Sequence, residues 1–142
     1  MDTALTKTSA AFNYSVKILE HHLDTFGHVN NAKYLEIFEE ARWELISQNG
    51  FGLEDVHRIK MGPIILGIEI QFKKEIKNRE IITITTQCTS YEGKIAKLTQ
   101  KMIKHNGEEA CEATFTFGLF DFKTRKLISP MAEWLKAIGL SE

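Results

Sequence analysis

The sequence has 142 residues, of which 43% are hydrophobic, and 18 basic residues stand against 19 acidic ones. A chain of this length can bury roughly two thirds of its unfolded surface, which is enough for one core without disulfides, so no second domain is needed. A formal net charge of −1 gives no electrostatic footprint for nucleic acid or an anionic membrane. Residues 1–142 are therefore expected to form a single domain that acts on small molecules or proteins.

The sequence shows neither a targeting signal nor a membrane span. The first ten residues lack the apolar core of a signal peptide, and no later stretch approaches the roughly 18 apolar residues that cross a bilayer. Cys88 and Cys111 stand alone in predicted strands, so we expect small core residues in a reducing compartment. The protein is expected to be cytoplasmic, with residues 1–11 flexible.

The first predicted elements are a strand and a long helix. Residues 14–19 alternate as in a strand with one face in the core, and lead into Asp24. Apolar residues then recur at helical spacing from Tyr34 to Ile46, which predicts a helix of about four turns. Asn30 and Asn31 are suited to cap its start, and Asn49 with Gly50 to end it. Glu39 and Arg42, three residues apart, can pair along its surface.

The second half of the chain reads as strands joined by turns. Residues 50–57 are predicted to form a connector with one short helical turn, and residues 61–63 to break structure before the next strand. Strands are expected at about 64–73, 82–90, 95–104 and 109–122, the last one central and covered on both faces. Ser129 and Pro130 then suit the start of a short helix that ends at Gly139.

This order predicts an α+β architecture, because links so short can join only antiparallel strands. The long helix is the one partner large enough to cover the apolar face of a five-stranded sheet, so the sheet is expected to wrap around it. Apolar surface that the helix leaves uncovered, together with the open sheet edges, predicts self-association.

The most suggestive chemistry lies where the first strand meets the helix. Asp24 stands shortly before the predicted first turn, and Gly27 lets the backbone bend between them. Amides at a helix start, with the positive end of the helix dipole, can stabilise an oxyanion, and a carboxylate beside them is a hydrolase arrangement. Asp24 can equally act as a turn former that closes an Asx turn or assists the helix cap.

A metal site is the alternative at this turn, since His21, His22, Asp24 and His28 are all possible ligands. Adjacent residues of a strand point to opposite faces, so His21 and His22 cannot both face one ion. No metal is therefore expected, and His28 is expected to form hydrogen bonds near the turn.

The segment Asp24-x-x-Gly27-His28-Val29-Asn30-Asn31-x-x-Tyr34, followed by Glu39-x-Ala41-Arg42, resembles the signature of hotdog-fold acyl-CoA thioesterases of the 4-hydroxybenzoyl-CoA thioesterase type. The resemblance extends in pattern over about residues 14–122. It implies a hotdog fold and hydrolysis of acyl-CoA, or of acyl carrier protein thioesters, without a cofactor. It also implies a homodimer or homotetramer with active sites at the subunit boundary.

Carried onto this sequence, the resemblance makes Asp24 the catalytic carboxylate, as general base or nucleophile, with Glu39 in reserve. The surrounding turn and pocket positions are Gly27, His28, Asn30, Asn31 and Tyr34. The amides of residues 29–31, beginning at Val29, are expected to polarise the thioester carbonyl.

The acyl group calls for an apolar pocket, for which we expect Tyr34 and Phe38 from the helix and Ile64 and Ile65 from the strand. The phosphates of CoA call for cations near the pocket mouth. The candidates near strand ends are Lys73, Lys74, Arg79, Lys94 and Arg125.

Two alternative functions remain open. A hotdog domain can bind acyl-CoA as a sensor without cleaving it, because one fold hosts many functions. A hydratase or dehydratase on the same fold would need an acid/base pair, for which Asp24 and His28 are available.

Overall fold

The computed structural model describes residues 8–140. Its elements are β1 (Phe12–Lys17), the short 3₁₀ helix η1 (Glu20–His22), α1 (Asn31–Gln48), α2 (Leu53–Ile59), β2 (Met61–Phe72), β3 (Ile81–Glu92), β4 (Ile95–Ile103), β5 (Glu109–Asp121), β6 (Lys126–Ile128) and α3 (Ala132–Ala137). Within these residues no helix is long and apolar enough to cross a membrane.

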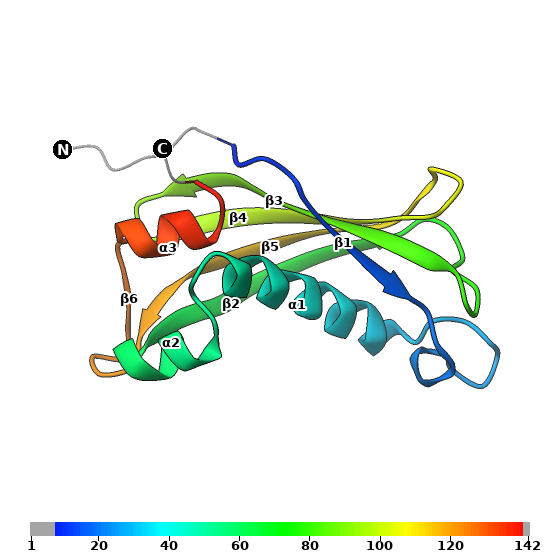
Figure 1. The fold of residues 1–142 in the computed structure, drawn as a ribbon, viewed down its shortest axis with the longest axis horizontal. Helices are drawn as coiled ribbons and strands as arrows, with labels where there is room; N and C mark the ends of the chain where they lie inside the picture. The colour runs from blue at the N-terminus through cyan, green and yellow to red at the C-terminus, as the bar shows by residue number, and fades with distance from the viewer. Residues whose placement is uncertain (1–7, 141–142) are drawn as a thin grey trace.

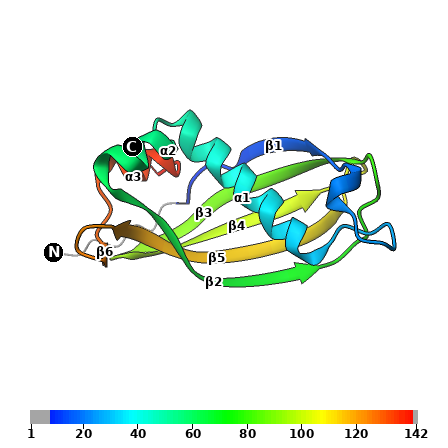
Figure 2. The same cartoon turned by 90° about the horizontal axis from the view of Figure 1, so that it is seen from below.

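The strands form one antiparallel sheet in the order β1-β3-β4-β5-β2, and β6 pairs with the end of β5. Helix α1 lies along one face of this sheet (Figure 1) and crosses it diagonally, so that its first turn lies near β5 and β2 and its last turn near α3 (Figure 2). The expected sheet around one long helix is confirmed. The sixth strand, β6, is only three residues long, too short for its periodicity to predict.

The core lies between α1 and the sheet. Six residues of α1 are buried, namely Tyr34, Ile37, Phe38, Ala41, Leu45 and Ile46. Phe38 is fully buried and meets Phe115 of β5 edge-on, with the ring centroids 5.9 Å apart. This contact holds the middle of α1 against the central strands, which fixes where each end of the helix lies.

The ends of α1 agree with the sequence. Asn30 is the N-cap, and its side chain accepts a hydrogen bond from the amide of Ala32, while Asn49 is the C-cap. The start of α3 differs from the prediction. Met131, rather than Ser129, precedes its first residue, and no side chain caps it.

β2 begins earlier than expected, because Met61, Gly62 and Pro63 belong to the strand instead of breaking it. Proline is tolerated here because β2 is the edge strand of the sheet, where a missing N–H costs no ladder bond. The connector before it forms the seven-residue helix α2, longer than the single turn expected.

A bulge at Leu66 changes the face on which the early residues of β2 lie. The pairing with β5 shifts between Ile65 and Gly67, so the strict alternation that the sequence suggests fails at this point. Ile65 pairs with the buried Phe117 on the helix side, whereas Ile64 pairs with Gly118 on the other face.

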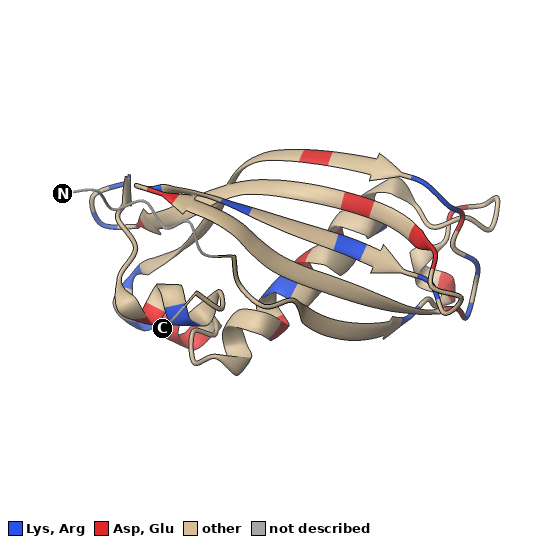
Figure 3. Cartoon of the chain, turned by 90° about the horizontal axis from the view of Figure 1, so that it is seen from above, with Lys and Arg blue, Asp and Glu red and all other residues tan. Residues whose placement is uncertain are grey.

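Seen from the side away from α1, the strands of the sheet carry several charged residues (Figure 3). The N-terminal segment reaches one edge of this sheet. Residues 1–7 of the segment expected to be flexible lie outside the described residues. Ser9, however, is buried, and its hydroxyl accepts a hydrogen bond from the amide of Cys88.

Candidate functional site

Asp24 lies in a tight turn that is closed by an isolated antiparallel bridge between Leu23 and Val29. The amide of Asp24 donates to the carbonyl of His28 at 2.7 Å, and Gly27 donates back to the carbonyl of Asp24 at 3.1 Å. Gly27 has a φ of +80°, a conformation that glycine adopts without strain. The turn therefore has one defined shape.

The carboxylate of Asp24 is partly exposed and shapes this turn. Its Oδ1 accepts hydrogen bonds from the amides of Phe26 at 2.8 Å and His28 at 3.1 Å. Asp24 is thus an Asx-turn residue, one of the two roles expected of it. Among residues 8–140 the structure gives its second oxygen, Oδ2, no donor, so this oxygen can act on a ligand.

The first turn of α1, which follows the Asp24 turn in the chain, offers one amide to a ligand. The amide of Asn30 donates to the carbonyl of His22, that of Ala32 to the side chain of Asn30, and that of Lys33 to the carbonyl of Asn30. The amide of Asn31 has no acceptor within the described part of the chain. Asn31 is therefore the first-turn residue able to donate to a ligand oxygen, at the positive end of the helix dipole.

An open pocket of about 500 Å³ lies between the end of the turn, the first turn of α1 and the segment after β2. It is lined by His28, Val29, Tyr34, Phe72, Lys73, Lys74, Glu75 and Ile76. Tyr34 and Phe72 meet edge-on with their centroids 4.8 Å apart, and His28 Nε2 lies 2.8 Å from Glu75 Oε1. Neither Asp24 nor Asn31 lines this pocket.

The basic residues expected to bind the phosphates of CoA lie at opposite ends of the molecule. Lys73 is held by Glu109 and Glu112, and Arg79 pairs with both oxygens of Glu20, whose pKa it lowers to about 2. Lys74, which lines the open pocket, is 3.6 Å from Glu108.

Lys94 and Arg125 lie in the β3–β4 and β5–β6 turns, at the other end of the sheet from Asp24. Of the five expected cations, Lys73, Lys74 and Arg79, between β2 and β3, are the ones at the same end of the molecule as the Asp24 turn.

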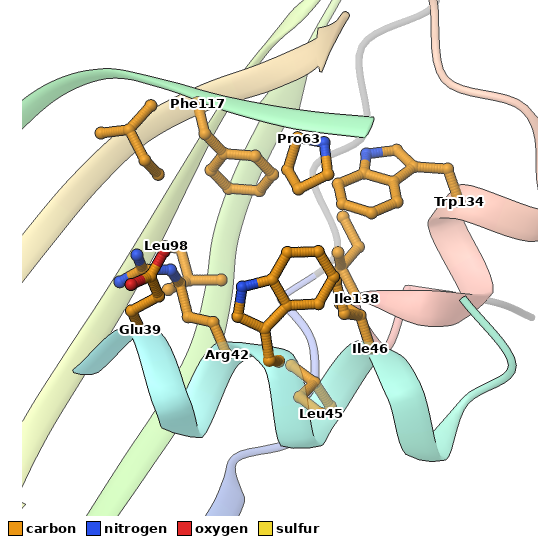
Figure 4. Close-up of a pocket in the computed structure, with 11 residues that line it drawn as sticks. Glu39, Arg42, Leu45, Ile46, Pro63, Leu98, Phe117, Trp134 and Ile138 are labelled. Carbon is orange, nitrogen blue, oxygen red and sulfur yellow. The ribbon is translucent and has the colours of Figure 1, made fainter. Parts of the chain in front are cut away.

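A second pocket, of about 100 Å³, lies between the C-terminal half of α1, the start of β2 and α3 (Figure 4). Its walls are mainly apolar, with Trp43, Ile65, Phe117 and Trp134 among them. The charged side chains that line it are Glu39 and Arg42, which rise from the same side of α1 in Figure 4.

Arg42 does not form the expected ion pair with Glu39. Its Nη1 donates instead to Gln100 Oε1 at 2.9 Å, and its guanidinium lies 4.3 Å from the ring centroid of Phe115. Burial lowers the pKa of Arg42 to about 10, while Glu39 acts in the opposite direction. Both partners of Arg42 lie on strands of the sheet. The helical spacing of Glu39 and Arg42 could not predict them.

Comparison with known proteins identifies the family. The profile of the Thioesterase-like superfamily matches residues 18–138. The chain belongs to this superfamily. It is also 34% identical to the long-chain acyl-CoA thioesterase FadM of Escherichia coli over 116 residues, which are 80% of this chain and 86% of that protein.

Solved structures agree with this membership. The probable thioesterase YbaW of Escherichia coli is 28% identical, with a TM-score of 0.80 over 89% of this chain and 98% of that one. The Staphylococcus aureus protein SAV2348, solved in complex with CoA, has a TM-score of 0.84 at 17% identity, over 92% and 82% of the two chains. The hotdog fold is therefore confirmed for this member of the superfamily.

The residues predicted for the acyl pocket of this thioesterase-like chain are not gathered in one place. Tyr34 lines the open pocket, and Ile65 lines the smaller one. Phe38 is a core residue, and Ile64 lies on the other face of the sheet, so neither lines a pocket. Gln100, which binds Arg42, was missed because a single polar residue in a strand resembles a surface position.

Metal ligation finds no support within residues 8–140, where no group of three or more possible ligands comes together. His22 Nδ1 accepts a hydrogen bond from the amide of Leu19 at 2.9 Å, and its ring lies against His21 with centroids 4.0 Å apart. These histidines lie in η1, just before the Asp24 turn.

Proposed function

We propose that this chain hydrolyses acyl-CoA thioesters to a free acid and CoA. The observation that carries the proposal joins two groups at the turn before α1. Among residues 8–140, Asp24 Oδ2 has no donor and the amide of Asn31 has no acceptor. The relationship to FadM, a long-chain acyl-CoA thioesterase, supports acyl-CoA as the substrate.

In this mechanism the amide of Asn31 donates to the thioester carbonyl and stabilises the negative charge that develops on its oxygen. Asp24 Oδ2 either takes a proton from the attacking water or attacks the carbonyl carbon itself, giving an anhydride that water then cleaves. The C–S bond breaks, and the CoA thiolate leaves and is protonated. Asp24 Oδ1 keeps its two backbone donors throughout, so the turn holds its shape.

The same geometry supports an oligomer, either a homodimer or a homotetramer, with active sites between subunits. Asp24 and Asn31 line neither pocket of the single chain, so a second subunit is needed to enclose them. The edge strand β2 is suited to that contact, because Leu66, Ile68 and Phe72 are 48%, 44% and 52% exposed and its outer edge has no partner strand in the described part of the chain.

Within the chain, Lys74 is the residue we favour for binding a phosphate of CoA. Lys73 and Arg79 are less suited, because each already contacts two carboxylate oxygens. Lys94 can contribute only if another subunit brings it to the Asp24 turn.

A non-catalytic acyl-CoA sensor is the second candidate, and one observation favours it. Asp24 Oδ1 already serves the turn, so the carboxylate has a structural reason to be present. A hydratase is disfavoured, because His28 Nε2 is directed to Glu75 rather than to the space beside Asp24.

The experiment that separates these candidates is release of free thiol from a panel of short, medium, long and aromatic acyl-CoAs by the purified chain, with binding of each measured in parallel. Turnover of at least one member supports the thioesterase. Binding without release of thiol supports the sensor and contradicts the proposal.

A further inference from the structure

The pocket of about 100 Å³ at the far end of α1 has an unusual composition. Ligand pockets usually measure about 300–1,000 Å³, so this one has room for one end of a ligand rather than for all of it. Its walls are mainly apolar, yet a guanidinium and a carboxylate, those of Arg42 and Glu39, share the lining.

Arg42 retains donors that can serve a ligand. Among the described residues it has one hydrogen-bond acceptor, Gln100 Oε1, which takes a single N–H of Nη1. No fully buried side-chain nitrogen of the described chain lacks a partner, so Nε and Nη2 of Arg42, which have none there, are not fully buried. The accessible space that Arg42 lines is the pocket.

One face of α1 leads from the candidate catalytic turn to this pocket. Asn31, Leu35, Glu39 and Arg42 follow one face of α1 at spacings of four, four and three residues. Leu35, between the helix start and the pocket, is 37% exposed, and so is Ile65, which lines the pocket. Arg42 lies eleven residue steps along the helix from Asn31, or roughly 16 Å.

We infer that this pocket receives the far end of a long acyl chain and selects a chain that carries a hydroxyl group there. The inference rests on the proposed thioesterase function, with the thioester at the amide of Asn31. A hydroxyl both donates and accepts, so it can accept from Arg42 and donate to Glu39. A terminal carboxylate can accept from Arg42, but it is repelled by Glu39.

A methyl terminus would leave the donors of Arg42 without a partner when it displaces water from the pocket. A site that hydrogen-bonds a substrate hydroxyl discriminates against the analogue without it. We therefore expect the ω-hydroxyacyl-CoA of suitable length to exceed the plain acyl-CoA in kcat/KM by about tenfold or more, the ratio expected for one hydrogen bond to a charged group.

The test measures kcat/KM of the purified full chain for matched sets of plain, ω-hydroxy and ω-carboxy acyl-CoAs from about eight to eighteen carbons. The hydroxyl preference should peak at one chain length, because only that length places the hydroxyl beside Arg42. No preference, an equal preference at every length, or a preference for the carboxylate would overturn the inference. If no acyl-CoA is hydrolysed, the proposed function itself fails.

Variants test whether Arg42 is the residue that selects the hydroxyl group. Arg42→Met should bring the hydroxyl-to-plain ratio to about one, whereas Arg58→Met, which removes an exposed arginine paired with Asp55 on α2, should leave the ratio of the wild type. Should Arg42→Met not fold, Ile65→Phe fills the pocket from its exposed side and should abolish the preference as well. A wild-type ratio retained in folded Arg42→Met contradicts the assignment to Arg42.

Discussion

At the scale of single residues, Gln100 is the polar centre of the contact between α1 and the sheet. It is fully buried, and its Nε2 donates to the carbonyl of Phe38 at 3.0 Å and to Thr86 Oγ1 at 2.9 Å, while its Oε1 accepts from Arg42. Both ends of the amide are thus used. A buried polar group with its partners satisfied fixes one arrangement of the elements that it joins.

Gln100→Leu should lower the free energy of unfolding by about 2–4 kcal/mol, because it leaves several buried polar groups without partners. Chemical denaturation measures this change. Thr99→Val, at the neighbouring and partly exposed position of β4, serves as the control and should stay within about 0.5 kcal/mol of the wild type. Equal stability of the two variants would contradict the role of Gln100.

At the scale of elements, the sequence predicted what periodicity can encode. The long helix with its asparagine caps, the four long strands and the turn at Asp24 follow from local pattern. Pro63 and the bulge at Leu66 did not follow, because the edge position of β2 and the shifted register are set by pairing with β5. Ile64 lies on the face of the sheet away from α1 for this reason, as one slipped residue reverses the face of a strand.

The candidate site shows the same division between local features and long-range contacts. Asp24, Gly27 and Asn31 could be placed from the sequence, since a turn and a helix start are local features. The partners of Arg42 could not, because Gln100 and Phe115 lie in strands far along the chain. The positions of the turn and the helix start were therefore predictable, whereas the second pocket required the folded sheet.

The exposed side of β2 leads to a prediction about assembly. Ile68 is 44% exposed on the helix side of the sheet, and a charge there would be buried unpaired in the proposed subunit contact. Ile68→Lys should convert the oligomer to a monomer in light scattering and lower thioesterase activity. Glu69→Lys, on the opposite face of the same strand, should keep both the wild-type mass and the activity. A monomeric wild type would contradict the proposed contact.

At the scale of the whole molecule, two buried thiols and a buried phenol make the free energy of unfolding depend on pH in the alkaline range. Burial raises the pKa of Cys88 to about 11 and those of Cys111 and Tyr91 to about 12, from ordinary values of 9.0 for the thiols and 10.0 for the phenol. Each group keeps its proton longer in the folded chain. The unfolded chain therefore releases protons first as pH rises, which favours unfolding.

The denaturant midpoint should accordingly be steady up to about pH 9 and fall progressively toward pH 12, the window between the ordinary and folded pKa values. A Cys88→Ala/Cys111→Ala variant should show a shallower fall, whatever its stability at neutral pH. A midpoint that does not change up to pH 11 would show that these groups titrate alike in the folded and unfolded states.

The role of Asp24 is the centre of this account, and the most direct test is kcat/KM for thiol release by Asp24→Asn on the best acyl-CoA of the panel. Asparagine keeps an oxygen that can accept from Phe26 and His28, so the turn should persist. Asp121→Asn is the matched control, because Asp121 Oδ1 likewise accepts from a nearby amide, that of Lys123, at the far end of the sheet.

We expect Asp24→Asn to lose at least about 100-fold, the contribution of a general base, while Asp121→Asn keeps wild-type activity. If Asp24→Asn retains full activity, Asp24 is a turn residue alone, and the catalytic carboxylate must be sought at Glu39.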